Sequence, residues 1–251
     1  MDVKLPEPRQ DWLARQLAAG GPVVASEVAA ALGVSVDTIR RDIIALEAAG
    51  HARRVRGGAV PVKGPDAPMA AKIAGRARPS AALVAAVLMR VEGAKTFLID
   101  GGSTALALAE ALPVTPDLLV MTPSPWVAVA CNERGIAVHL IGGALPPGGA
   151  VATGAESEMA LAGLAAEVAV IGACGLDADH GLSADSDGEA RLKRAMAASC
   201  ELVLVPVSAE KLRLRARFRA LEPQEIDVVV TDAGSADTAG YEDRGIEVIH
   251  V

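Results

Sequence analysis

The sequence predicts an α/β protein in two parts, a small N-terminal winged helix-turn-helix and a larger α/β domain with a mostly parallel sheet. The first sixty residues contain short helices with sharp stops, followed by a basic hairpin. A stretch with four prolines then runs from Pro61 to Pro79, and beyond it helices alternate with short, nearly all-apolar strands. We therefore predict domains at residues 1–60 and 80–251, joined by a linker at 61–79.

Three helices are expected in the first part. Their signals are Arg9 to Ala19 before Gly20-Gly21-Pro22, Ser26 to Leu32 before Gly33, and a third helix that ends at Gly50. Ser35 is a natural N-cap for the third helix, in which Ile39, Ile43 and Leu46 recur at helical spacing and predict one buried face. The run from His51 to Val60 combines strand-forming valines, two glycines and three arginines, as a basic wing would.

This arrangement predicts contact with duplex DNA, because the second helix of a helix-turn-helix enters the major groove with its first residues nearest the bases. The residues expected to face DNA are Ser35, Thr38, Arg40 and Arg41 on the helix, and Arg53, Arg54 and Arg56 on the wing. Arginine suits guanine edges, and the wing arginines suit phosphates. The alternative is a surface ion pair between Asp37 and Arg41 on an ordinary helical bundle.

Charge is distributed unevenly along the chain. Residues 51–78 hold seven basic side chains and one acidic, or 7 − 1 = +6, whereas residues 79–251 hold 12 basic and 23 acidic, or 12 − 23 = −11. A basic belt beside an acidic body favours a polyanionic partner at the belt, although a solvated linker would look similar. Aromatic residues make up only 2% of the chain, which disfavours a base-stacking RNA or single-strand binder.

Composition also indicates in which compartment the protein is found. No apolar run reaches the length of a membrane span, and residues 1–10 lack a secretory signal, so we expect a cytoplasmic protein without a membrane partner. The three cysteines, Cys131, Cys174 and Cys200, are far apart and are expected to be reduced and mostly buried. No cofactor and no metal is expected.

Seven strands are expected in the second part. They are Thr96–Asp100, Leu118–Thr122, Ala137–Ile141, Val168–Gly172, Leu202–Val207, Val228–Asp232 and Glu247–Val251, with helices such as Ser103–Leu112 and Glu189–Ala198 between them. This alternation is typical of a mostly parallel sheet covered on both faces.

The run VSVDTIRRDIIALEAAGHARRVRGGAV, Val34 to Val60, resembles the signature of DeoR-type bacterial repressors. The resemblance continues through LIDGGSTALALAEAL, LIGGAL, IGACGLDADHGLS, EARLKRAM and VVVTDAG and so covers nearly the whole chain. It implies a sensor domain akin to sugar-isomerase and CoA-transferase folds, a phosphorylated sugar as inducer, and a homo-oligomer.

The loop Asp100-Gly101-Gly102-Ser103-Thr104 is the expected effector cradle, because it ends an apolar strand and opens a helix. Its glycines permit close backbone approach, its hydroxyls donate hydrogen bonds, and a helix start favours an anion such as phosphate. The alternative is a tight turn with Ser103 as cap. No GxxxxGK[ST] motif occurs, so nucleotide hydrolysis has no support.

Other strand ends are expected at the same crevice, since ligands of open α/β sheets bind at the carboxyl ends of strands. The further candidates are Thr122, Ser124, Gly142, Gly143, Gly172, Asp177, Glu189, Lys211 and Asp232. We expect Lys211 to neutralise a phosphate and Asp100 or Asp177 to accept sugar hydroxyls. For Lys193, one turn after Glu189, a surface ion pair between the two is favoured.

Two departures from the family pattern put the usual sugar-phosphate specificity in doubt. Thr122-Pro123-Ser124 stands where Thr-Asn-Ser is usual, and Ser208-Ala209-Glu210 stands where Asp-Ser-Ser or similar precedes the lysine. The alternative function is a phosphosugar isomerase-like enzyme, but a Lys-Gly-Gly-Gly segment is missing. We therefore predict a non-enzymatic, sequence-specific repressor with no catalytic residues.

Overall fold

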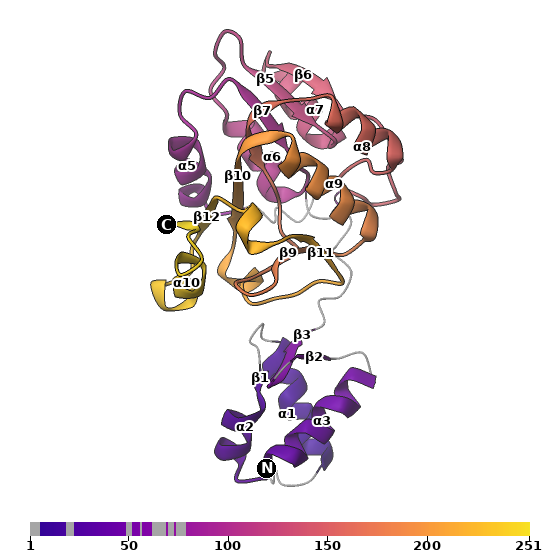
Figure 1. Cartoon of the computed structure of the whole chain (residues 1–251), viewed down its shortest axis with the longest axis vertical. Coiled ribbons are helices and arrows are strands. Elements are labelled where there is room, and N and C mark those ends of the chain that lie inside the picture. The colour runs from indigo at the N-terminus through magenta and orange to yellow at the C-terminus, as the bar shows by residue number, and fades with distance from the viewer. Residues whose placement is uncertain are drawn as a thin grey trace. The chain divides into compact units, whose positions relative to one another are not determined.

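The computed structural model of the chain (Figure 1) describes residues 6–18, 23–48, 52–55, 57–61, 69, 73 and 79–251. The chain forms two compact units, a smaller one that includes Met1–Gly64 and a larger one that includes Pro65–Leu212 and Arg217–Val251. The predicted order, a small helical unit followed by an α/β unit, is confirmed.

The smaller unit is a winged helix-turn-helix. Its elements are α1 (Pro6–Ala18), β1 (Val23–Val24), α2 (Ala25–Leu32), α3 (Val36–Ala48), β2 (Ala52–Val55) and β3 (Gly58–Pro61). The wing hairpin of β2 and β3 is antiparallel, and β1 adds a third strand beside β3. Leu13 and Leu17 of α1 pack with the predicted stripe of α3, Ile39, Ile43 and Leu46, in one core.

The larger unit alternates helices and strands. Its elements are α5 (Ala81–Arg90), β4 (Thr96–Ile99), α6 (Ser103–Ala111), β5 (Leu119–Thr122), α7 (Pro125–Glu133), β6 (Ala137–Leu140), α8 (Ala155–Ala162), β7 (Ala166–Val170), β8 (Gly175–Asp177), β9 (Gly181–Ala184), α9 (Asp187–Ala198), β10 (Cys200–Val207), η1 (Ala209–Lys211), β11 (Phe218–Leu221), η2 (Pro223–Glu225), β12 (Val228–Thr231), α10 (Ser235–Glu242) and β13 (Glu247–His250).

All seven predicted strands pair in one sheet in the order β13-β12-β10-β7-β4-β5-β6, and every pairing is parallel. The sequence did not predict a second, antiparallel sheet of β11, β9 and β8. These strands have three or four residues each and contain Gly175 and Gly181, so the alternation that marks a strand is too short to detect.

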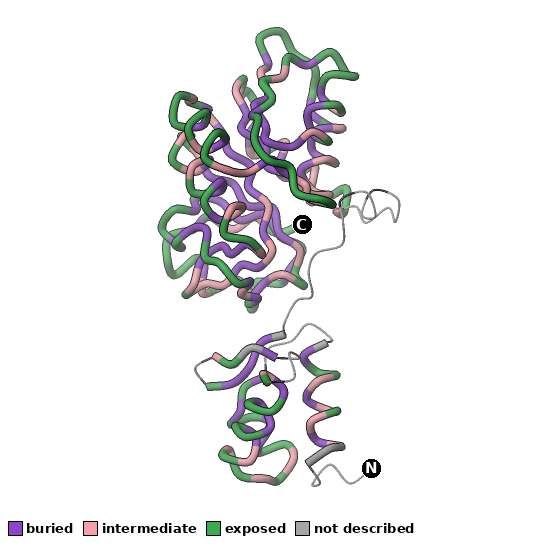
Figure 2. Tube along the Cα trace, turned by 90° about the vertical axis from the view of Figure 1, so that its right-hand side faces the viewer, coloured by how far each residue is buried: buried purple, intermediate pink, exposed green. Residues whose placement is uncertain are grey.

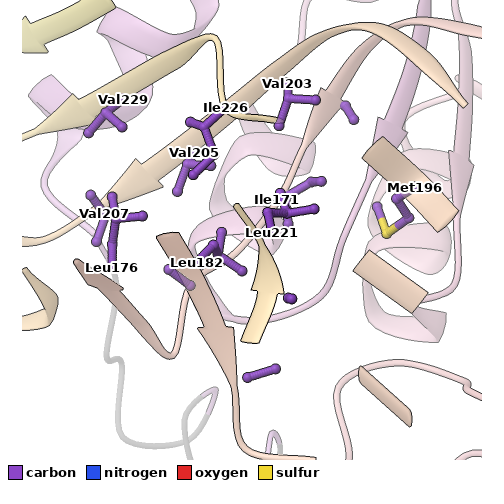
Figure 3. Close-up of a cluster of buried hydrophobic side chains, with 14 of the residues drawn as sticks. Ile171, Leu176, Leu182, Met196, Val203, Val205, Val207, Leu221, Ile226 and Val229 are labelled. Atoms are coloured by element: carbon purple, nitrogen blue, oxygen red, sulfur yellow. The ribbon is translucent and has the colours of Figure 1, made fainter. Parts of the chain in front are cut away.

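The seven-stranded sheet separates two apolar layers, and Figure 2 shows the buried residues of the unit gathered in its interior. On one face, Phe97 and Ile99 of β4 pack in a cluster with residues of α5, α6 and α7. On the other face, Leu98 joins a cluster that includes Met196 of α9 and Tyr241 of α10. Figure 3 shows Leu176, Leu182 and Leu221 of the small sheet in this second cluster. Because both faces of β4 are covered, Phe97, Leu98 and Ile99 are all apolar.

The chain reverses its direction across the sheet between β4 and β7. From β4 it continues outward through β5 and β6, and it then returns to β7 on the opposite side of β4 and continues through β10, β12 and β13. Open α/β sheets bind ligands at such a switch point, outside the carboxyl ends of the strands. Asp100 follows β4 there, and Gly172 lies two residues beyond β7.

Candidate functional site

Helix α3 presents its predicted polar side to solvent. The Ser35 hydroxyl accepts a hydrogen bond from the backbone N–H of Thr38 at 3.1 Å and so caps the helix start. The side chains of Arg40 and Arg41 are 66% and 82% exposed, while Ile39 and Ile43 face the core. The residues expected to read bases therefore lie on the accessible face of the helix.

Asp37 lies near both arginines, so the ion pair considered as an alternative is present. Its carboxylate is 3.6 Å from the Arg40 guanidinium and 3.7 Å from that of Arg41. Such long, exposed pairs contribute about 0–1 kcal/mol, so a phosphate or base edge can replace them. On the wing, Arg54 donates its backbone N–H to Glu47 at 2.8 Å. Arg56 and the side chain of Arg53 lie outside the described residues.

A buried ion pair holds α1 against α3. The Arg9 guanidinium bonds both carboxylate oxygens of Asp42, and the side-chain amide of Gln10 donates to the same carboxylate at 3.0 Å. Arg9 is 4% exposed and Asp42 is 3% exposed. We did not predict this pair from the sequence, although an aspartate directly before Ile43 of the apolar stripe is a signal for a buried charge that needs a partner.

A second buried ion pair lies at the switch point of the larger unit. Lys193 of α9 donates to the Asp100 carboxylate and, at 2.8 Å, to the carbonyl of Gly172. The backbone N–H of Gly172 donates to the same carboxylate oxygen at 2.9 Å. The ends of β4 and β7 and helix α9 are therefore tied together at one point.

The expectation of a surface ion pair for Lys193 was wrong. Lys193 is 5% exposed, and its partner is Asp100, which lies 93 residues away along the chain. Burial alone would lower the pKa of Lys193, but attraction to Asp100, with contributions from Cys174 and Glu189, holds that pKa above its ordinary value. The ammonium group is therefore charged at neutral pH.

The loop after β4 has the geometry of a helix-start cradle. Gly102 is the N-cap of α6 with φ 108°, a backbone angle that favours glycine, and Ser103 is the first helical residue and not the cap. A side chain at Gly101 would meet the carbonyl of Ala150 at 2.7 Å and Val151 at 2.6 Å. Both glycines are therefore required by the local structure.

The segment 150–153 connects several predicted site residues. It contacts Gly101, its Ala152 N–H donates to the carbonyl of Pro123 at 2.8 Å, and Thr153 lies 3.3 Å from the position of a Cβ on Gly188 in α9. The ends of β4 and β5 and the start of α9 thus lie against the same segment.

The end of β5 contributes two buried hydroxyl groups. Thr122 accepts a hydrogen bond from the N–H of Ser124 at 3.0 Å, and both residues are fully buried. Among the described residues, the Ser124 hydroxyl has no hydrogen-bond partner. A buried polar group without a partner is costly unless a ligand or water satisfies it.

Beyond β6, Gly142 and Gly143 lie against α8. The Ser157 hydroxyl donates to the carbonyl of Gly142 at 2.6 Å, and a Cβ at Gly143 would lie only 2.1 Å from that hydroxyl oxygen. This close approach accounts for a glycine at position 143. Contact of Gly142 and Gly143 with an effector stays a prediction.

Asp177 and Lys211 belong to other local structures. The Asp177 carboxylate accepts the N–H groups of Asp179 at 3.0 Å and His180 at 2.9 Å, as in the turn of a small hairpin. Lys211 ends η1, which is tied to Asp232 through the N–H of Ala209 at 2.6 Å. Glu189 is half-buried, and its N–H is capped by Ser186 at 3.2 Å. The effector roles of Asp177, Glu189 and Lys211 stay predictions.

All three cysteines are free, as expected, but only Cys131 is buried. Loss of water around the buried Cys131 thiol and the partly buried Cys200 thiol raises the pKa of each to about 11. In the described part of the chain no helix is both long and apolar enough to cross a membrane. Over the same residues, no group of three or more acidic, histidine or cysteine side chains has the geometry to hold a metal ion.

A winged helix-turn-helix followed by an α/β unit whose parallel sheet has a topological switch point defines a class, the DNA-binding transcription regulators with an attached sensor domain. The chain belongs to the DeoR family. The DeoR-like helix-turn-helix domain matches residues 9–63, and the DeoR C terminal sensor domain matches residues 80–233.

Similar proteins carry regulator names. A putative aga operon transcriptional repressor of Escherichia coli O157:H7 is 26% identical over 97% of this chain and 93% of its own length. The HTH-type transcriptional regulator GlpR of Haloferax volcanii is 29% identical over 87% of each chain. A ribose-5-phosphate isomerase in complex with phospho-erythronic acid is a structural neighbour at 16% identity and TM-score 0.39, over 52% of this chain and 51% of the isomerase.

Proposed function

We propose that the protein is a repressor whose affinity for operator DNA is controlled by a phosphorylated sugar or similar metabolite. Helix α3, through Ser35, Thr38, Arg40 and Arg41, reads the major groove, and the wing arginines contact phosphates. The protein works in the cytoplasm as a homo-oligomer, which suits two half-sites one helical turn apart. Repressor names among similar proteins support this proposal.

The observation that carries the effector proposal is the position of the α6 start at the switch point, three residues after Asp100. The N–H groups and hydroxyls of Ser103 and Thr104 bind the phosphate, and Lys211 adds a positive charge. Asp100 already accepts hydrogen bonds from Gly172 and Lys193. Asp100 therefore holds the loop in place. Thr122, Ser124 and Glu189 bind the hydroxyl groups of the sugar.

Thermal unfolding with a panel of sugar, polyol and acid phosphates tests this proposal. A ligand at a hundredfold excess over its dissociation constant stabilises the folded state by about 2.7 kcal/mol, whereas the unphosphorylated counterpart should give no shift. Ser103→Ala with Lys211→Ala should abolish the shift. Ser235→Ala with Arg217→Ala is the matched control, because it also removes a helix-start hydroxyl and one charge. A shift that survives the first double substitution would show that this loop is only a turn.

We expect no phosphosugar isomerase activity. Such an enzyme needs a carboxylate base beside the bound phosphate, and the Asp177 carboxylate is engaged in its own hairpin turn. Incubation of the protein with pentose and hexose phosphates, followed by NMR, should give no isomerised product. Turnover that Asp177→Ala abolishes would reverse this conclusion.

A further inference from the structure

A cavity of about 450 Å³ lies at the amino edge of the large sheet. We call it the amino-edge cavity. Its wall is apolar and is formed by Leu88, Val91, Phe97, Leu112 and Leu118. Its volume lies within the range of about 300–1,000 Å³ that is usual for small-molecule sites.

The amino-edge cavity is separate from the proposed effector site. Its lining includes residues 93–95, which precede β4, and residues 115–118, which precede β5. Asp100 and Thr122 lie at the opposite ends of the same two strands. Because β4 and β5 are parallel, the two sites lie at opposite edges of the sheet.

The cavity carries charges of both signs among its lining residues. The Lys95 ammonium is 3.9 Å from the Asp117 carboxylate, and these side chains are 62% and 80% exposed. Glu92, also in the lining, is exposed as well. An ion pair so long and exposed contributes little, so a ligand can replace either partner at small cost.

Some backbone groups beside the cavity are already hydrogen-bonded. The N–H of Lys95 donates to Glu167 at 2.7 Å, and its carbonyl accepts from Leu119 at 2.8 Å. The N–H of Leu118 donates to the carbonyl of Thr115 at 3.4 Å. The side chains of Lys95, Asp117 and Glu92 are exposed and can pair with a charged ligand.

We propose that the amino-edge cavity binds a free α-amino acid with an apolar side chain, of which leucine is the probe. The side chain enters the apolar wall, the carboxylate pairs with Lys95, and the ammonium group pairs with Asp117 or Glu92. A sugar phosphate lacks the apolar body that the wall requires. An apolar alcohol lacks the two opposite charges, and a polar amino acid leaves the wall empty.

Titration of the full-length protein with L-leucine, followed by amide and methyl NMR, tests the proposal. Leucine is expected to shift the resonances of α5 and the Lys95 turn with a Kd on the order of 1 mM. L-Serine lacks the apolar side chain, and 3-methylbutan-1-ol lacks the two charged groups. Each should bind at least about tenfold more weakly than leucine. No binding of leucine, or equal binding of either control compound, would overturn the proposal.

Two neighbouring residues provide matched variants. Leu88→Trp fills the cavity and should abolish leucine binding, whereas Met89→Trp, at an adjacent position that is 77% exposed, should leave it unchanged. Asp117→Asn removes one charge at a position with φ 67°, which asparagine tolerates, and should weaken binding about tenfold. Leucine binding that survives Leu88→Trp would place the ligand elsewhere. Ser103→Ala should not alter leucine binding, so this test is independent of the proposed effector site.

Discussion

Both units bury an ion pair, but the two pairs are placed differently. In the smaller unit, Arg9 and Asp42 join two helices within an apolar core, and the exposed arginines of α3 lie on another side of the helix. In the larger unit, Lys193 and Asp100 join a helix to a strand end at the switch point of the sheet, where we propose the effector site. The first pair therefore holds a core together, whereas the second fixes the geometry of the loop where we propose the effector site. Four substitutions test this difference between the two units.

The largest effect is expected for Asp42→Ala, because it leaves the Arg9 guanidinium buried without its counter-charge. The free energy of unfolding of the smaller unit should fall by about 3–5 kcal/mol, and DNA binding should be lost with it. Urea unfolding followed by circular dichroism measures this change. Arg9→Met with Asp42→Leu removes both charges and should restore both stability and DNA binding. If Asp42→Ala is as stable as the wild type, this pair has no structural role.

Lys193→Met should cost about 3 kcal/mol, toward the lower end for a broken buried pair, because Gly172 still donates to Asp100. The double variant Asp100→Asn with Lys193→Met should regain stability but not the thermal shift by a sugar phosphate. If the thermal shift were recovered, the pair of Lys193 and Asp100 would have a structural role only, like the pair of Arg9 and Asp42.

The stability that Lys193 contributes should also depend on pH, because its pKa is raised in the folded protein. This stability is fully present below the pKa that Lys193 has in the unfolded chain, and it is lost as pH rises through the pKa of the folded state.

Arg41→Ala changes an exposed side chain, so its effect should appear in recognition and not in folding. Loss of a bidentate base contact should cost about 1–3 kcal/mol for the specific operator. Arg54→Ala should instead weaken binding to all sequences and lower its salt dependence. Fluorescence anisotropy with operator and scrambled duplexes separates the two. Equal binding by wild type and Arg41→Ala at every salt concentration would contradict the proposed role of α3.

The smallest effect is expected for Glu167→Gln. The Glu167 carboxylate accepts the N–H groups of Lys95 and Thr96, and these bonds lower its pKa. Its stabilisation is therefore present above the unfolded pKa and is lost as pH falls through the folded one. The variant should have a flatter acid limb in a plot of unfolding free energy against pH. An unchanged acid limb would show that these hydrogen bonds do not couple to protonation.

The large sheet was predictable because a strand covered on both faces is apolar throughout. Val228 to Thr231, for example, has no other plausible role in a chain that alternates helices and strands. The small sheet was not predictable, because β8, β9 and β11 gain stability from the hydrophobic cluster shared with α9 and not from a local pattern.

The candidate site was predictable only in part. The strand-to-helix loop at Gly101 to Thr104 follows from its place after an apolar strand, and its role in effector binding stays a prediction. The role of Lys193 does not, because its helical neighbour Glu189 offers a local partner, while Asp100 becomes a neighbour only when β4, β7 and α9 meet. The partner of Asp42 was not predictable for the same reason, because Arg9 lies 33 residues away on another helix and is brought near only by folding.

Strand β4 has only four residues, yet contacts on both of its faces and at both of its ends fix its register. Phe97 and Ile99 belong to one core and Leu98 to the other, while Asp100 follows at one end and Lys95 precedes the other. A slip by a single residue would exchange the two faces and move both ends at once. Insertion or deletion of one residue between Lys95 and Asp100 should therefore prevent the larger unit from folding. The same change in the exposed turn at Pro146 and Pro147 should be tolerated, which makes that turn the natural position for a tag or a fused reporter.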